Sequence, residues 1–117
     1  MHSRATILCI DDDKLGLYVR KLVLESAGYA VITASSGRDG VRLFRAHTVD
    51  VVILDYYMPG MHGGTVAIEL KRIRPKIPII MLSAYLLLSD EVFESIDLCI
   101  QKGQPPEMLL TKIRNLV

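Results

Sequence analysis

The chain lacks several features that mark particular classes of protein. It has two cysteines among 117 residues, Cys9 and Cys99, and neither lies in a CxxC pattern. We therefore expect two free core thiols in a reduced cytosol, without a disulfide between them. No apolar run approaches the roughly 20 residues that a membrane helix needs. The first apolar stretch is short and acids follow it at once, which is unlike a signal peptide. The expected location is cytoplasmic, without membrane contact.

Charge of one sign is not in excess either. Fourteen basic residues stand against thirteen acidic ones, and the formal net charge is +1. This balance gives no argument for a nucleic-acid or membrane surface, so any functional charge must be local. The sequence also has no linker, no internal repeat and no GxxxxGK[ST] nucleotide loop. Its length suits one domain with its own hydrophobic core, and we predict a single domain over residues 1–117.

Short apolar runs alternate with segments of helical periodicity. Strands are predicted at residues 5–10, 29–34, 49–55, 77–84 and 96–102, and helices at 14–27, 37–47, 64–74, 89–95 and 105–117. In the first helix, the side chains predicted to face inward are Leu15, Tyr18 or Val19, Leu22 and Leu24. Continuous apolar strands are typical of a parallel sheet that is covered by helices on both faces, which predicts an α/β fold.

Polar residues follow the predicted strands at their carboxyl ends, where open parallel sheets gather their functional groups. They are Asp11, Asp12 and Asp13 after the first strand, Asp55 after the third, Ser83 after the fourth and Lys102 after the fifth. Several carboxylates in one place repel one another unless a cation joins them, and hard oxygen ligands suit Mg²⁺. A carboxylate beside such an ion can attack phosphorus, while lysine and serine bind the phosphoryl oxygens. The pattern therefore predicts Asp55 as an aspartyl-phosphate site.

Four stretches carry a family resemblance through their order and spacing: ILCIDDDK, VDVVILDYYMPGMHG, IPIIMLSA and IDLCIQK. Together they resemble the receiver domain of response regulators in two-component signalling, over essentially the whole chain. The resemblance implies a flavodoxin-like, doubly wound, five-stranded parallel sheet of order 2-1-3-4-5. It also implies a signalling switch rather than an enzyme.

The resemblance further implies a role for each residue of the site. Asp55 would accept a phosphoryl group from a histidine kinase or phosphotransfer protein. The implied Mg²⁺ ligands are Asp11, Asp12, Asp55 and the backbone carbonyl of Tyr57, and the implied phosphoryl-binding side chains are Ser83 and Lys102. Phosphorylation would change the partner-binding surface, and the face of the fourth helix, fifth strand and fifth helix would bind an output partner or a second copy.

Three features depart from the family pattern. Cys99 stands where an aromatic residue is usual, three positions before the lysine, and Gly103 stands where a proline usually follows it. Only eighteen residues separate Ser83 from Lys102, which predicts that the fourth helix is short or irregular. The run Leu86–Leu88 predicts an exposed apolar patch for a partner, with a refolded local core as the alternative.

Tyr57 and Tyr85 occupy the two variable positions that flank the phosphorylation site in this family. Two bulky aromatic side chains there would shield an acyl phosphate from water. We therefore predict a long-lived phosphorylated form.

Two other functions remain open from the sequence. Asp11 and Asp13 formally match the Asp-x-Asp nucleophile signature of a small haloacid-dehalogenase-type phosphatase, although that reading gives Asp55 no role. A receiver-like binding module that no longer switches is the other alternative, because of the departures at Cys99 and Gly103. The sequence fits either a stand-alone receiver or a piece of a larger regulator or hybrid kinase.

Overall fold

The structure, a computed structural model, describes residues 4–84 and 89–117. The strands are β1 (Thr6–Ile10), β2 (Ala30–Ala34), β3 (Val51–Asp55), β4 (Ile79–Ser83) and β5 (Leu98–Gln101). The helices are α1 (Lys14–Ser26), α2 (Gly37–Ala46), α3 (Gly63–Ile73), α4 (Asp90–Glu94) and α5 (Pro106–Leu116). All ten predicted elements are present, and their ends differ from the predicted ones by two residues at most.

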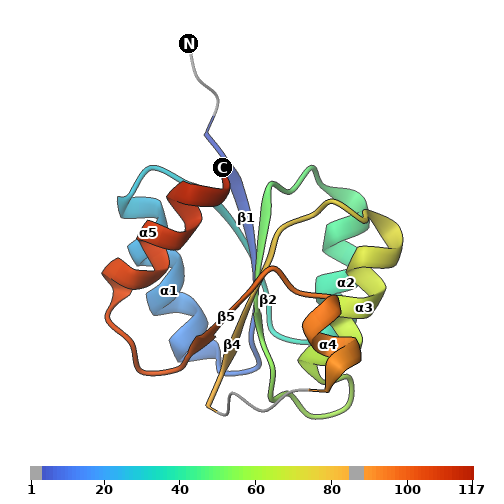
Figure 1. Ribbon diagram of the computed structural model, residues 1–117. Coiled ribbons are helices and arrows are strands. Elements are labelled where there is room, and N and C mark those ends of the chain that lie inside the picture. The colour runs from blue at the N-terminus through green and yellow to red at the C-terminus, as the bar shows by residue number, and fades with distance from the viewer. Residues whose placement is uncertain (1–3, 85–88) are drawn as a thin grey trace.

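The five strands form one parallel sheet in the order β2-β1-β3-β4-β5. Helices α1 and α5 cover one face, and α2, α3 and α4 cover the other (Figure 1). This arrangement confirms the flavodoxin-like topology that the family resemblance implied. The order places β1 and β3 side by side in the middle of the sheet, so that the segments following them lie next to each other.

Each strand contributes to two cores because its side chains alternate between the faces of the sheet. On β1, Leu8 and Ile10 belong to the core under α2 and α3, whereas Ile7 and Cys9 belong to the core under α1 and α5. The first core is the larger and contains the fully buried Phe44. The continuous apolar character of the strands therefore follows from burial on both faces.

The inward face of α1 differs from the predicted one. Leu24 is buried as expected, but Leu15 and Tyr18 are 73% and 59% exposed, and Val19 and Leu22 are exposed as well. The helix buries Leu17 instead. Apolar residues occur at helical spacing on two sides of this helix, so spacing alone did not identify the buried side. Its orientation depends on packing against the sheet.

Capping side chains and a glycine mark the ends of the helices. Asp13 caps α1 by accepting a hydrogen bond from the Gly16 N–H at 3.2 Å, and Gly28 follows that helix with φ of 97°. Ser36 caps α2 in the same way. Helix α4 has only five residues, which confirms that the fourth helix is short. The predicted patch Leu86–Leu88 and Tyr85 lie outside the described residues.

Both cysteines are free, as predicted. Cys9 is fully buried, and its burial raises the pKa of the thiol to about 12, so it stays protonated at neutral pH. Cys99 is half-buried on β5. None of the helices in the described part of the chain has the length and apolar character needed to cross a membrane.

Candidate phosphoacceptor site

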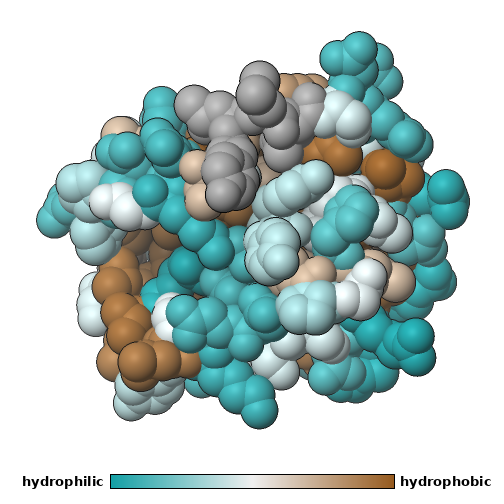
Figure 2. All heavy atoms as spheres, turned by 90° about the horizontal axis from the view of Figure 1, so that it is seen from below, coloured by the Kyte–Doolittle hydropathy of each residue, from teal (hydrophilic) through white to brown (hydrophobic). Residues whose placement is uncertain are grey.

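Two carboxylates meet at the carboxyl ends of the central strands. Asp11 follows β1 directly and Asp55 ends β3, and Ile10 pairs with Leu54 in the register between these strands. Asp11 is 2% exposed and Asp55 is 1% exposed, whereas Asp12 is exposed. Figure 2 looks at the molecule from this end and shows hydrophilic residues at its centre. The sheet thus brings together acids that lie 44 positions apart in the sequence.

The three predicted metal-binding carboxylates lie close enough to share one ion. Asp11, Asp12 and Asp55 each offer an oxygen atom, and these atoms lie within 4.8 Å of one another. Oδ1 of Asp55 is fully buried and has no hydrogen-bond partner among the described residues. This buried carboxylate and its two neighbouring carboxylates together offer a set of hard oxygen donors. The site therefore fits Mg²⁺.

Lys102 supplies positive charge to this pocket. Its Nζ lies 2.5 Å from Oδ1 of Asp55, a contact with the distance of an ion pair but without the angles of a hydrogen bond. Burial raises the pKa of Asp55, the Lys102 ammonium opposes that rise, and the neighbouring Asp11 carboxylate adds to it. The ionised form of Asp55 is thus costly in the fold and depends on nearby cations.

Ser83 and Lys102 come together across β4 and β5. The backbone N–H of Lys102 donates a hydrogen bond to the carbonyl oxygen of Ser83 at 2.9 Å, and Ser83 is 2% exposed. Both residues lie at the same end of the sheet as the acids. All five residues whose side chains are predicted for the site therefore lie at the carboxyl end of the sheet: Asp11, Asp12, Asp55, Ser83 and Lys102. Tyr57, predicted through its backbone carbonyl, follows β3 and its side chain is 79% exposed.

Two glycines shape the loops of the site. A Cβ atom on Gly63 would lie 2.3 Å from the carbonyl oxygen of Asp55 and 2.7 Å from Cα of Tyr56, so only glycine allows α3 to start against this backbone. Gly103 has φ of 93°, which favours glycine and which proline cannot adopt. The departure at Gly103 therefore has a structural reason: the loop after Lys102 takes a left-handed turn where family members usually carry proline.

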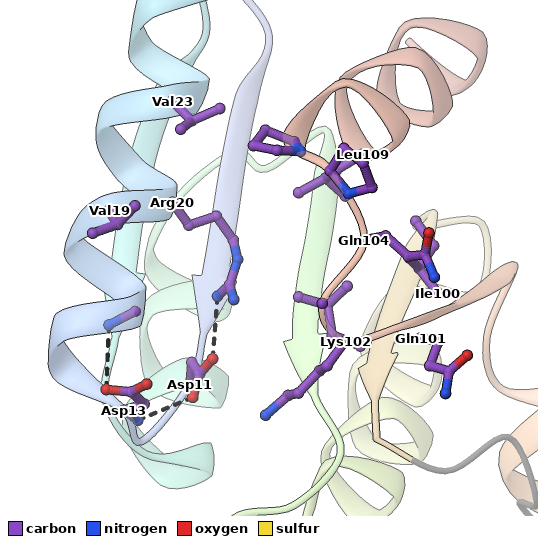
Figure 3. A pocket seen from close by; sticks show the side chains of 15 residues that line it. Asp11, Asp13, Val19, Arg20, Val23, Ile100, Gln101, Lys102, Gln104 and Leu109 are labelled. Carbon is purple, nitrogen blue, oxygen red and sulfur yellow. Dashed lines mark hydrogen bonds and ion pairs between the residues drawn. The ribbon is translucent and has the colours of Figure 1, made fainter.

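Arg20 is the residue of this site that the sequence analysis missed. Its Nη1 lies 3.2 Å from Oδ2 of Asp11, and the Asp11 side chain is 3% exposed. Figure 3 shows Arg20 extending from α1 towards Asp11, with Lys102 approaching the same end of the sheet from the opposite side of the pocket. An arginine among apolar residues of α1 was the available signal. It was overlooked because the inward face of that helix was misassigned.

Fold and site together define a class of protein, and comparison with known sequences agrees. The sequence profile of the response regulator receiver domain matches residues 7–114. The chain belongs to this family, whose members act as phosphorylation-dependent switches in two-component signalling. Among curated relatives, the transcriptional regulatory protein GlrR of Escherichia coli is 38% identical over 91 residues, or 78% of this chain. The match covers 20% of GlrR, so the chain spans about a fifth of that relative.

Solved receiver structures match the fold closely. A CheY-like receiver domain from Methanospirillum hungatei has a TM-score of 0.91 and 30% identity, covering 97% of this chain and 93% of its own. The response regulator TrrA from Thermotoga maritima, solved in complex with Mg²⁺ and BeF, has a TM-score of 0.91 and 32% identity. That match covers 97% of this chain and 99% of TrrA.

Proposed function

We propose that this domain accepts a phosphoryl group on Asp55 from the phosphohistidine of a histidine kinase or phosphotransfer protein, with Mg²⁺ as cofactor. The observation that carries the proposal is the state of Asp55. Its carboxylate is 1% exposed, an ammonium lies 2.5 Å from its Oδ1, and two further carboxylates lie beside it. A purely structural ion pair would need only one acid.

The transfer is a displacement at phosphorus. An Asp55 oxygen forms the new P–O bond, the P–N bond of the phosphohistidine breaks, and its electron pair returns to the imidazole. The carboxylate must be ionised to attack, and the Lys102 ammonium favours that form by lowering the pKa that burial raises. Lys102 thus prepares the nucleophile before transfer and can bind a phosphoryl oxygen afterwards.

The remaining polar residues have complementary tasks. Asp11, Asp12, Asp55 and the backbone carbonyl of Tyr57 would hold Mg²⁺. When bound, this ion neutralises negative charge on the transferring group. The Ser83 hydroxyl can donate to a phosphoryl oxygen, because it ends the strand next to β3 and is held at the Lys102 backbone. Stabilisation of the developing charge is the main catalytic contribution expected from such a site.

We further propose that phosphorylation is read on the face formed by α4, β5 and α5, by an output partner or a second copy. Phe93 on α4 and Met108 on α5 are 47% and 40% exposed, so this face offers apolar side chains to a partner. Cys99 on β5 cannot supply the rotating aromatic side chain usual in the family. The switch is therefore proposed to act through Ser83.

The phosphodonor reaction tests the proposal directly. Incubation with acetyl phosphate and Mg²⁺ is expected to add one phosphoryl group, seen by intact-mass spectrometry, and Asp55→Asn is expected to abolish the addition. Asp13→Asn is the matched control, because Asp13 caps α1 and asparagine caps helices equally well. Addition retained in Asp55→Asn would contradict the proposal, and addition on Asp11 would favour the phosphatase alternative.

A further inference from the structure

A cation lies where the core side of α1 would normally be apolar. Leu17 and Leu24 are the buried residues of this helix, and Arg20 lies between them in sequence at a spacing of three and four. The Arg20 side chain is only 19% exposed. Placing a guanidinium this deep is costly unless it has a charged partner, and Asp11 is that partner at 3.2 Å.

Each oxygen of Asp11 already has a partner within the fold. Oδ1 accepts the backbone N–H of Asp13 at 3.0 Å, and Oδ2 faces the Arg20 guanidinium. Each of the two buried acids thus has its own cation, since Lys102 approaches Asp55. The side chains of Arg20 and Lys102 therefore supply positive charge to the two buried acids without a bound metal ion.

We propose that Arg20 is a built-in counter-ion that competes with Mg²⁺ for Asp11 and so weakens metal binding at the site. This inference rests on the proposed function, because it assumes that the acids bind a divalent ion. The three carboxylates carry three negative charges, and Lys102 and Arg20 offset two of them. Removal of Arg20 leaves a pocket with one more uncompensated negative charge, which attracts a divalent cation more strongly.

A pocket beside Arg20 has room for the guanidinium when it moves away from Asp11. A cavity of about 440 Å³ lies between α1 and the β5–α5 segment, and Arg20 forms part of its wall (Figure 3). Apolar side chains on both sides, including Val23 and Leu109, also line it. The aliphatic part of Arg20 can stay on this apolar wall while the charged group leaves Asp11. Arg20 therefore competes without blocking the site.

Mg²⁺ titration by isothermal calorimetry tests the inference without any phosphodonor. Arg20→Met is expected to bind Mg²⁺ about tenfold more tightly than the unaltered protein, or about 1.4 kcal/mol. Arg20→Lys, which keeps the charge, is expected to stay within about threefold of the unaltered protein, on the same electrostatic argument. The matched control is Arg42→Met, because Arg42 is an exposed arginine whose ion pair with Asp39 lies on α2. It removes the same charge away from the pocket and is expected to leave the affinity unchanged.

The outcomes separate the inference from the proposed function. Equal or weaker Mg²⁺ binding by Arg20→Met overturns the competition and makes Arg20 a residue that positions Asp11. Absence of Mg²⁺ binding in both the unaltered protein and Arg20→Met overturns the proposed metal site itself. If Arg20→Met does not fold, Arg20→Gln replaces it, with the same tightening expected and the same result counting against the inference.

Discussion

The two faces of the sheet are packed to different degrees. On the α2–α3 side, a Cβ atom on Gly40 would lie 2.4 Å from the Cδ1 atom of Ile10, so helix and strand are in close contact. On the α1–α5 side, the core is smaller, and an open pocket of about 440 Å³ lies between α1 and the β5–α5 segment. Apolar side chains of α1 are exposed there, and Figure 2 shows hydrophobic residues on this side of the molecule.

This difference separates the fixed parts of the site from the movable ones. The loop after Asp55 is held through Gly63, which starts α3 on the tightly packed side. The cations reach the acids from the other side, since Arg20 and Lys102 both line the cavity. Tight packing fixes backbone positions, whereas long side chains beside a cavity can change place. We therefore expect the long side chains of Arg20 and Lys102 to be the adjustable components of the site.

The largest effect on stability is expected from truncating a core side chain on the α2–α3 side. Phe44→Ala should lower the free energy of unfolding by about 3–5 kcal/mol, because a fully buried ring is lost from a dense core. The Arg74 guanidinium also loses the ring that lies 4.0 Å from it. Leu109→Ala, at the half-buried wall of the cavity, should cost only about 1 kcal/mol. Urea unfolding monitored by circular dichroism measures the free energy of unfolding of both variants. Equal losses of stability in the two variants would contradict the difference between the faces.

A pair of glycine substitutions sharpens the same comparison. Gly40→Ala should destabilise by about 1–3 kcal/mol, since the added methyl group meets a buried isoleucine. Gly16→Ala on α1 meets only the end of the Asp13 side chain at 2.8 Å, and alanine favours the helix by about 0.5–1 kcal/mol. We expect it to be neutral or stabilising in thermal unfolding. A loss at Gly16 as large as at Gly40 would contradict this expectation and would mean that the added methyl group disturbs the Asp13 cap.

A smaller effect is expected from the charge of Asp55. Its pKa is raised above 3.8 in the fold, so the native state binds more protons than the unfolded chain between pH 3.8 and the raised value. Stability therefore falls as pH rises through that window, and ionised Asp55 remains a cost above it. In metal-free buffer at neutral pH, Asp55→Asn should raise the melting temperature and remove this part of the pH dependence.

Asp39→Asn is the control for the Asp55 measurement, because Asp39 is an exposed acid on α2. It is expected to change neither the melting temperature nor its pH dependence to a comparable extent. A lower melting temperature for Asp55→Asn would mean that the Lys102 ion pair outweighs the cost of burial.

The sequence predicted most of the fold because its signals are local and agree with one another. Apolar runs identified the strands, helical periodicity identified the helices, and the position of polar residues after strands identified the site. The inward face of α1 could not be predicted, because two sets of apolar residues share helical spacing and the choice depends on the sheet. The same ambiguity concealed Arg20.

Other contacts depend on approaches between distant segments, which no local pattern encodes. Gly63 is required by a backbone that reaches it from β3. The ion pair of Lys71 with Asp97, at 2.8 Å, joins α3 to the start of β5 across 26 positions. Asp97 also accepts the Ile79 N–H at 2.8 Å, so one acid ties together three elements. A charge-rich helix end in the sequence does not reveal such partners.

The central claim is that the carboxylates of Asp11, Asp12 and Asp55 hold one divalent ion. A crystal grown with Mn²⁺, which takes the same oxygen ligands as Mg²⁺, tests this most directly through its anomalous scattering. We predict a single strong anomalous peak between the three carboxylates, lost in Asp12→Asn. A well-ordered pocket without that peak, or a peak that does not contact Asp55, would contradict the account.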